Sequence, residues 1–455
     1  MSAGLSTAHP VRPSYDAFEF SGFELSGRTI RLRYRLTGGP EPALAFEERL
    51  DLPSALPAPD AADPIVRRLL DGIHRAFGVS YFKAAIPLNL LAAPVSEADA
   101  GFWNALYTEG LGEFWYGNRL DPRGRVSFPS GGASEPGPQR PIGYADERVL
   151  VLAGGGKDSA VAREVVRHAG VRADALSLGT APWLRRSVTA MGLEHLVIRR
   201  TIDPGLFELN RRGAWNGHVP ISACIAFVAT LVAYVGGYGA VVAANEASAD
   251  QGNVEWNGLS INHQWSKTLR FEQAFQEWCD RNVGQSPRYF SLLRPLGSLR
   301  IAEAFARHPA YFDSFTSCNA NFRQGVLAEQ PRWCGRCAKC VFVQLALRPH
   351  LDDDTLLAIF GGDFLSDPAN APVLEALVGL AESKPFDCVG TVEESRAALA
   401  RLVSTGRLRT PLRDSILERV AAAVGDPEFA WRRATGFRAE HRIPPAWEER
   451  LLAYL

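Results

Sequence analysis

Alternating strand and helix patterns predict an α/β region in the middle of the chain. Four short apolar runs have the length and composition of buried strands: residues 149–152, 173–178, 195–198 and 240–244. Apolar residues at helical spacing separate these runs. This order favours a doubly wound parallel sheet, which binds ligands at the carboxyl ends of its strands. We therefore expect an α/β domain over residues 146–300.

The N-terminal region has a different pattern. Residues 18–25 and 29–36 alternate apolar and polar positions, as half-buried antiparallel strands do. Residues 65–77 have the apolar spacing of a helix. Pro, Gly and Ser are frequent in residues 127–140, which favours a linker. A separate α+β domain is therefore expected over residues 1–145.

The C-terminal region, residues 301–455, is predicted to be mostly helical. Thr391 and Glu394 precede an apolar run of helical period. Their spacing is that of a capping box, in which each side chain satisfies a backbone N–H at the helix start.

One stretch, residues 219–244, carries no charge and imitates a membrane span. A glycine-rich turn at 236–239 interrupts it, so a buried helix followed by a buried strand is expected instead. The first residues of the chain form no apolar signal region. We therefore expect no membrane association.

Composition and charge disfavour nucleic-acid-binding, membrane-binding and disulfide-rich classes of protein. The 455 residues suffice for two or three domains, and 46% of them are hydrophobic. A net charge of -1 gives no global attraction to nucleic acid or to anionic membranes. Seven cysteines, three of them in C-x-x-C-x-x-C, do not form the pattern of an oxidised scaffold. A cytoplasmic protein with no nucleic-acid partner is expected.

The strongest chemical signal is a glycine loop between the first buried strand and the following helix. Glycines let the backbone approach a ligand closely, and the free N–H groups of a helix start attract anions. The spacing is neither that of a Walker A loop nor G-x-G-x-x-G. The alternative is an ordinary strand–helix turn. The candidate phosphate-binding residues are Gly154, Gly155, Gly156, Lys157, Asp158 and Ser159.

Two later loops carry further candidates. Glu246 follows the fourth buried strand, where it is a candidate Mg²⁺ ligand or base, with helix capping by its neighbours as the alternative. His263 exchanges protons near neutral pH, and Lys267 suits a phosphate or carboxylate. Arg294 and Arg300 suit either an anion clamp or structural salt bridges.

A cysteine cluster is the second strong signal. Thiolates at two-residue spacing converge on one tetrahedral ion, and four of them imply a structural zinc site. An iron–sulfur cluster and unligated buried thiols are the alternatives. The remaining cysteines, Cys224, Cys279 and Cys388, have apolar neighbours and are expected in the core. The predicted ligands are Cys318, Cys334, Cys337 and Cys340.

The glycine loop resembles the PP-loop, S-G-G-x-D-S, of ATP pyrophosphatases, although Gly154 replaces its first serine. Further motifs make the resemblance more specific. These are ANEAS, NHQWSK, SLLRPLGSLRIAEAF, the cysteine cluster, KPFDCVG and the N-terminal VSYFKAAIP. Together they resemble the family of ATP-dependent epimerases acting on UDP-N-acetylmuramoyl-L-alanyl-L-glutamate, over nearly the whole chain.

The resemblance implies inversion of the terminal L-glutamate of the UDP-sugar dipeptide during peptidoglycan synthesis in the cytoplasm. ATP would be consumed to AMP and diphosphate, with Mg²⁺ near Asp158 or Glu246. It also implies the nucleotide-binding fold of PP-loop proteins. His263 is the candidate acid–base group for one face of the glutamate α-carbon. Lys267, Glu246 and His218 are the candidates for the other face. The sequence does not give the oligomeric state.

Two other classes of protein fit parts of the pattern. One is another carboxylate-adenylating PP-loop enzyme, such as the synthases that convert a deazaguanine carboxylate to a nitrile, although those chains are shorter. The other is a non-catalytic protein that senses zinc and nucleotide. RNA-thiolating relatives are disfavoured, since they would need a basic face.

Overall fold

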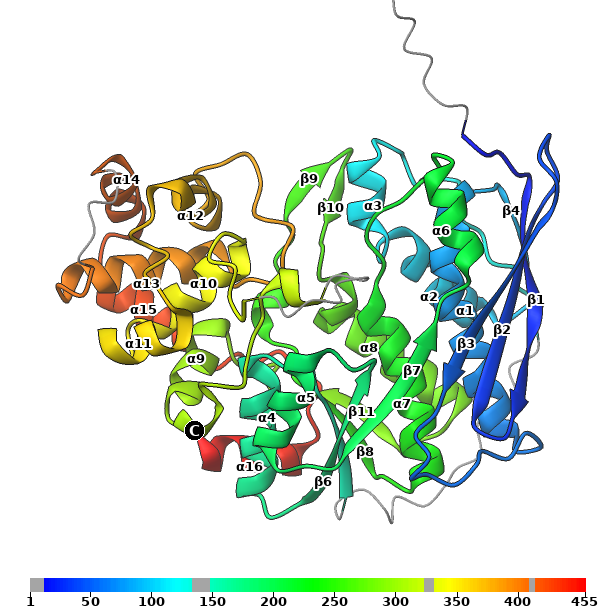
Figure 1. Ribbon diagram of the computed structural model, residues 1–455, viewed down its shortest axis with the longest axis horizontal. Coiled ribbons are helices and arrows are strands. Elements are labelled where there is room, and N and C mark those ends of the chain that lie inside the picture. Colours follow the sequence, from blue (N-terminus) through cyan, green and yellow to red (C-terminus); the bar gives the residue numbers. More distant parts are fainter. Residues whose placement is uncertain (1–11, 133–147, 323–330, 409–413) are drawn as a thin grey trace, which may run out of the picture.

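One large sheet forms the centre of the molecule. The computed structural model describes residues 12–132, 148–322, 331–408 and 414–455. Within these residues nine strands form the sheet, in the order β11-β8-β5-β6-β7-β3-β2-β1-β4 (Figure 1). Neighbouring strands from β11 to β7 are parallel, as the α/β pattern predicts. Their bounds are Arg148–Leu152 for β5, Arg172–Leu178 for β6, His195–Thr201 for β7, Ala240–Ala243 for β8 and Arg288–Ser291 for β11.

The N-terminal strands extend the same sheet. The strand β3 pairs antiparallel with β7, and β2 and β1 continue the antiparallel order, with β4 parallel to β1 at the edge. A buried ion pair between Arg200 and Glu48 reinforces the junction, at 2.6 Å. The sheet therefore continues across the boundary expected near residue 145. The bounds are Ala17–Ser26 for β1, Thr29–Thr37 for β2, Leu44–Asp51 for β3 and Asn89–Leu91 for β4.

Both faces of the parallel strands are buried. Val149 and Val151 belong to one hydrophobic cluster, and Leu150 between them belongs to another. This alternation follows from the two-residue period of a strand. The helices α1 and α7 belong to the Leu150 cluster, and α4 and α9 to the other. The bounds are Pro64–Ala85 for α1, Lys157–His168 for α4, Ile221–Gly236 for α7 and Ser298–Ala306 for α9.

The uncharged stretch at 219–244 folds as expected. Gly237, which has a left-handed backbone conformation, caps the end of α7, and β8 follows in the sheet interior. No described helix has the length and hydropathy needed to span a membrane.

Part of the expected linker is structured. Phe128 is buried, and its ring contacts those of Tyr107 and Trp103. Gly132 donates its N–H to the carbonyl of Val95. The linker prediction is therefore wrong for residues 127–132, because an aromatic cluster holds them, and its remainder lies outside the described residues.

The C-terminal region is helical, as predicted, and lies on the opposite side of the parallel strands from β1–β4 (Figure 1). The capping box between Thr391 and Glu394 is present at the start of α13. The C-terminal helices are α10 (Ala338–Leu347), α11 (Asp353–Phe360), α12 (Ala371–Leu377), α13 (Val392–Ser404), α14 (Asp414–Val424), α15 (Pro427–Thr435) and α16 (Pro445–Tyr454). The other elements named below are α3 (Gly112–Gly117), β9 (Val254–Trp256) and β10 (Leu259–Ile261).

Candidate active site

The glycine loop connects β5 to α4 at the carboxyl end of the parallel strands. Gly155 has φ +80°, a conformation that glycine adopts at little cost. Gly156 is the N-cap of α4 and supplies no capping side chain, so N–H groups of the first turn stay available to a ligand. Thr316 donates its N–H to the Gly155 carbonyl and fixes the loop, at 3.0 Å. The loop thus has the form of an anion site.

Carboxylates surround the ammonium of Lys157, which is 3% exposed. Its Nζ donates to Asp158 and lies 3.8 Å from Glu246 Oε2. Burial alone would lower the pKa of Lys157, but these two carboxylates outweigh it and raise the pKa. Both oxygens of Glu246 also accept from the Ser298 hydroxyl, at 2.7 and 2.8 Å. Burial raises the pKa of Glu246 to about 7, although Lys157 opposes the rise.

A second buried lysine, Lys384, lies beside this group without a hydrogen-bond partner. Its side chain is 6% exposed, and no atom of the described residues accepts from its Nζ. Burial lowers the pKa of Lys384, and the carboxylates of Glu394 and Glu246 offset only part of the effect. A buried cation without a partner is unfavourable, and an anionic ligand would supply the missing partner.

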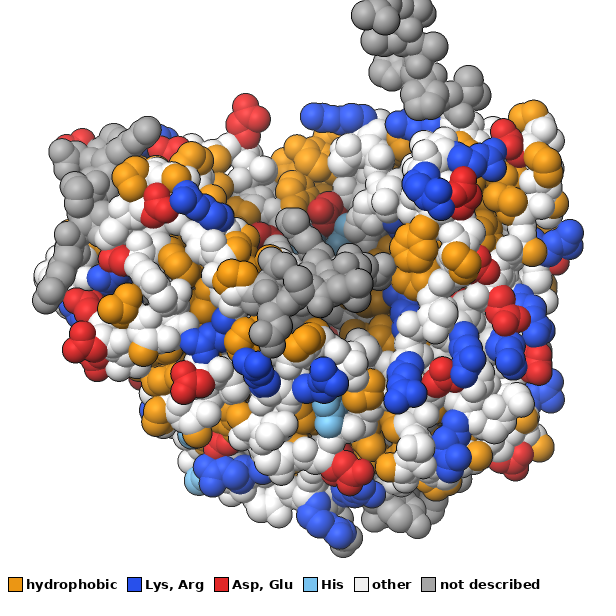
Figure 2. Space-filling view, viewed as in Figure 1, with side chains coloured by type: hydrophobic (Ala, Val, Ile, Leu, Met, Phe, Trp, Pro, Cys, Tyr) orange, Lys and Arg blue, Asp and Glu red, His pale blue; other side chains and the backbone are white. Residues whose placement is uncertain are grey.

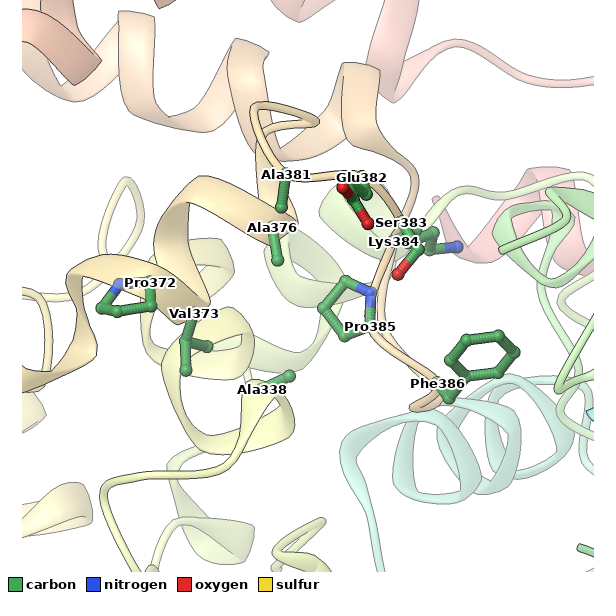
Figure 3. A pocket seen from close by; sticks show the side chains of 10 residues that line it. All are labelled: Ala338, Pro372, Val373, Ala376, Ala381, Glu382, Ser383, Lys384, Pro385 and Phe386. Atoms are coloured by element: carbon green, nitrogen blue, oxygen red, sulfur yellow. The ribbon is translucent and has the colours of Figure 1, made fainter. Parts of the chain in front are cut away.

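Residues 381–386, including Lys384, form one wall of a pocket of about 540 Å³ (Figure 3). Pro372, Val373 and Ala376 on α12 form the facing wall. The same segment continues to Cys388.

The third lysine, Lys267, contacts the thiol of Cys388, with 3.3 Å between Nζ and Sγ. Lys267 also interacts electrostatically with Asp158 and Glu246. Burial alone would raise the pKa of Cys388, but Lys267, Lys339 and His263 together hold it well below its usual value. Cys388 is half-buried among these charges, so its expected place in the apolar core is wrong. Cys224 and Cys279 are buried in the core, as expected.

His263 connects this thiol to the N-terminal region. Its Nδ1 hydrogen-bonds to Glu113 on α3, and its side chain also bonds Cys388. Burial alone would lower the pKa of His263, but these two bonds outweigh it and raise the pKa to about 9. His218 lies beside it, with ring centroids 4.5 Å apart. Burial, together with the charge of His263, lowers the pKa of His218 to about 4. A charged and a neutral imidazole therefore adjoin.

The arginine candidates are structural. Arg294 is 1% exposed and forms an ion pair with Glu272 at 3.0 Å. It also donates to the carbonyls of Glu246 and Lys267, so it holds the two site loops together. Arg300 pairs with Glu303 on its own helix. Of the two alternatives, the salt-bridge interpretation is confirmed.

Only five of the 49 basic residues (Lys and Arg) in the chain are lysines, and the others are arginines. All five interact electrostatically with groups described above. Lys157 does so with Glu246, Lys267 and Lys339 with Cys388, Lys384 with Glu246, and Lys83 with His218. The site thus concentrates compact cations whose pKa responds to burial, while the arginine beside it, Arg294, has a structural role. Figure 2 shows a hollow on this face, between the C-terminal helices and the elements β9, β10 and α3, with acidic and histidine side chains visible in it.

The four predicted cysteine ligands converge beside the start of α10. Their sulfurs all lie within 4.8 Å of one another. Two of the separations are 3.4 Å (Cys337 to Cys340) and 3.8 Å (Cys334 to Cys340). Sulfurs about 2.3 Å from a tetrahedral zinc ion are about 3.8 Å apart. The donor set therefore fits one zinc ion with a closed shell.

The structure brings Glu246, Lys267 and His263 together with the glycine loop. Sequence reasoning missed Glu113, Lys384 and Cys388. The motif KPFDCVG contains the last two and was the signal available for them. No local pattern marks Glu113, which reaches the site only through folding.

Comparison with known proteins assigns the family. The model of the MurL N-terminal domain matches residues 10–292, and that of the MurL C-terminal domain matches residues 314–430. Three curated relatives carry the name UDP-N-acetyl-alpha-D-muramoyl-L-alanyl-L-glutamate epimerase. The protein of Xanthomonas oryzae pv. oryzae is 39% identical over 96% of this chain and 97% of its own. The protein of Micromonospora sp. is 39% identical over 96% of this chain and 98% of its own. The protein of Salinispora tropica is 40% identical over 92% of this chain and 91% of its own. The chain therefore belongs to the MurL family and is an epimerase.

Proposed function

We propose that the protein inverts the α-carbon of the terminal L-glutamate of UDP-N-acetylmuramoyl-L-alanyl-L-glutamate after adenylating its α-carboxylate with ATP. AMP and diphosphate are the by-products. The names of the relatives support the epimerase reaction and its substrate. The observation that carries the adenylation step is the glycine loop, together with the buried lysines Lys157 and Lys384 beside it.

Adenylation addresses the main barrier of the reaction. Removal of a hydrogen next to a carboxylate would place a second negative charge beside the first. In the mixed anhydride the first charge is absent, and the carbonyl can accept the electrons of the broken C–H bond. Reprotonation from the other face inverts the centre, and water releases the free acid with AMP. Preorganised cations lower the energy of the enolate, as Lys267 would do here.

The proposed phosphate site consists of the loop N–H groups and two lysines. The α4 N-terminus favours negative charge, and Lys157 and Lys384 add point charges in a desolvated place. The carboxylates of Asp158 and Glu246 provide the oxygen ligands that Mg²⁺ prefers. When bound, that ion would neutralise charge on the phosphates. The cysteine cluster would hold a structural zinc ion, and no step of the reaction uses it.

His263 is proposed as the proton carrier for one face of the α-carbon. Its bond to Glu113 fixes the ring, and its pKa of about 9 keeps it protonated and able to donate near neutral pH. We expect the variant His263→Asn to lose solvent deuterium incorporation at the glutamate α-carbon by at least about 100-fold. His308→Asn is the matched control, because His308 bonds Tyr454 away from the site. Unchanged exchange in His263→Asn would remove this residue from the mechanism.

Diphosphate release tests the function as a whole. The full-length protein is mixed with ATP and Mg²⁺, with and without the UDP-linked L-Ala-L-Glu peptide. We expect peptide-dependent diphosphate and a D-glutamyl product. Tight ATP binding without turnover would instead indicate a nucleotide sensor. Epimerisation in the absence of ATP would refute the adenylation step.

A further inference from the structure

Cys388 is a free thiol whose surroundings suit a nucleophile. It is half-buried, and its sulfur does not belong to the cysteine cluster. Its neighbours are the ammonium of Lys267 at 3.3 Å and the hydrogen-bonded imidazole of His263. Reactive cysteines occupy such partly exposed, electropositive places, whereas structural cysteines lie in apolar ones.

Three side chains from distant parts of the sequence form a chain of hydrogen bonds. Glu113 bonds the Nδ1 of His263, and His263 bonds Cys388. A nucleophile bonded to a base, with the base oriented by a third group, is the arrangement that activates Ser and Cys nucleophiles. Neither the phosphate site nor the zinc site requires this arrangement.

The thiol also lies at the edge of the proposed phosphate site. Lys267 interacts with Cys388 on one side and with Asp158 and Glu246 on the other. Lys384 likewise interacts with both Glu246 and Cys388. An acyl group attached to a phosphate held between these lysines would therefore lie near Cys388.

We infer that Cys388 takes the glutamyl group from AMP as a thioester, and that the α-carbon is inverted while the group is on the enzyme. This inference rests on the proposed adenylation. It adds a covalent intermediate and an acyl-accepting residue to the epimerase reaction.

The steps balance without a further reactant. The thiolate attacks the carbonyl carbon of the adenylate, a C–S bond forms, the C–O bond to the phosphate breaks, and AMP leaves with the electron pair. The α-proton then moves to a base, and a proton returns from the opposite face. Finally, water adds to the thioester carbonyl, the C–S bond breaks, and the thiolate and one proton are released with the acid.

The positive charges around Cys388 explain why its thiol would act as a nucleophile and not as the base that removes the α-proton. The cations of Lys267, Lys339 and His263 favour the thiolate form of Cys388, which makes it a weak base while it stays nucleophilic. Acylation removes its negative charge from beside His263. The pKa of His263, which that charge helps to raise, would then fall towards the range in which imidazole exchanges protons. Thioester formation would thereby prepare His263 for proton transfer.

Rapid acid quenching tests the intermediate directly. The full-length protein is mixed with ATP, Mg²⁺ and the UDP-linked L-Ala-L-Glu peptide, quenched during the first turnovers and digested. We expect a peptide containing Cys388 with the mass of the substrate minus water, and hydroxylamine should remove this mass. Omission of ATP should abolish it. If no such adduct forms while epimerisation proceeds, the inference is wrong.

Cys388→Ser and Cys388→Ala separate the covalent step from adenylation. We expect both variants to release about one equivalent of diphosphate per chain, as in a burst, and to lose epimerisation by at least about 100-fold. Cys279→Ala is the control expected to keep activity, because Cys279 is buried and its electrostatic neighbours are Asp280 and Arg281, not the charges around Cys388. Circular dichroism checks that each variant is folded.

The outcomes distinguish the two proposals. If the wild type releases no peptide-dependent diphosphate, the proposed function fails and this inference fails with it. If diphosphate appears but Cys388→Ala epimerises within about tenfold of the wild type, only the thioester is refuted. If Cys388→Ala loses deuterium exchange and the wild type forms no adduct, Cys388 acts as a base and the inference is likewise overturned.

Discussion

The buried ammonium of Lys384 gives a prediction in which stability and binding change in opposite directions. The perturbation is Lys384→Met, which keeps most of the side-chain length and removes the charge. The pKa of Lys384 is lowered because burial destabilises its charged form by more than the carboxylates of Glu394 and Glu246 stabilise it. The free protein therefore loses stability by holding this charge, and the methionine variant should be more stable.

The size of the gain follows from the missing hydrogen bonds. A buried polar group without a partner costs about 1–3 kcal/mol. An unfolding entropy of about 2.1 cal/mol/K per residue corresponds to about 1 kcal/mol per degree for 455 residues. We therefore expect the melting temperature of the ligand-free protein to rise by about 1–3 °C.

Nucleotide binding should weaken in the same variant. A hydrogen bond to a charged group contributes about 1.5–3 kcal/mol, so loss of the ammonium should raise the Kd for Mg-ATP about 10- to 150-fold. The stabilisation by ATP should shrink accordingly, because it depends on the ratio of ligand concentration to Kd.

Calorimetry measures both quantities on the same preparations. Differential scanning calorimetry gives the melting temperatures with and without Mg-ATP, and isothermal titration gives the Kd. Arg211→Met is the control, since this exposed arginine pairs only with Glu208 on its own helix among the described contacts. A Lys384→Met protein that melts earlier and binds Mg-ATP as tightly as the wild type would show that the lysine is structural.

Two further predictions concern the ions. Removal of zinc by a chelator should destabilise the C-terminal helices by on the order of 10 kcal/mol, measured as loss of helical signal after metal analysis has found one zinc per chain. A melting temperature that is unchanged by the chelator would contradict the zinc site. The pKa of about 7 at Glu246 means that this carboxyl is neutral below pH 7 and charged above it. The Kd for Mg-ATP should therefore rise up to tenfold per pH unit below about 7, and in Glu246→Gln it should be independent of pH there.

Local patterns in the sequence determined much of the architecture. Four of the five parallel strands, β5 to β8, and the helix before β8 have their own hydrophobic signals, because burial on both faces requires continuous apolar runs. The fifth, β11, was not predicted. The glycine loop was predictable since its backbone conformation and its helix start depend on neighbouring residues. The cysteine spacing likewise brought three of the four sulfurs close together by itself.

Only the tertiary structure decided how the N-terminal region contributes. The pairing of β3 with β7 makes one sheet of strands that are distant in sequence, and it depends on long-range contacts such as Arg200 with Glu48. The alternating pattern predicted the strands and did not specify this partner, because any exposed sheet edge offers the same hydrogen bonds.

The chemistry of the site also depends on the fold. Cys388 looked like a core residue because its sequence neighbours include Phe386 and Val389. In the folded chain its charge state is set by Lys267 and His263, more than 100 residues away. The sequence determined which reactive groups are present, and the tertiary structure decided which of them meet. The physical reason is that side-chain pKa values respond to burial and to charges within a few ångströms, and these distances exist only after folding.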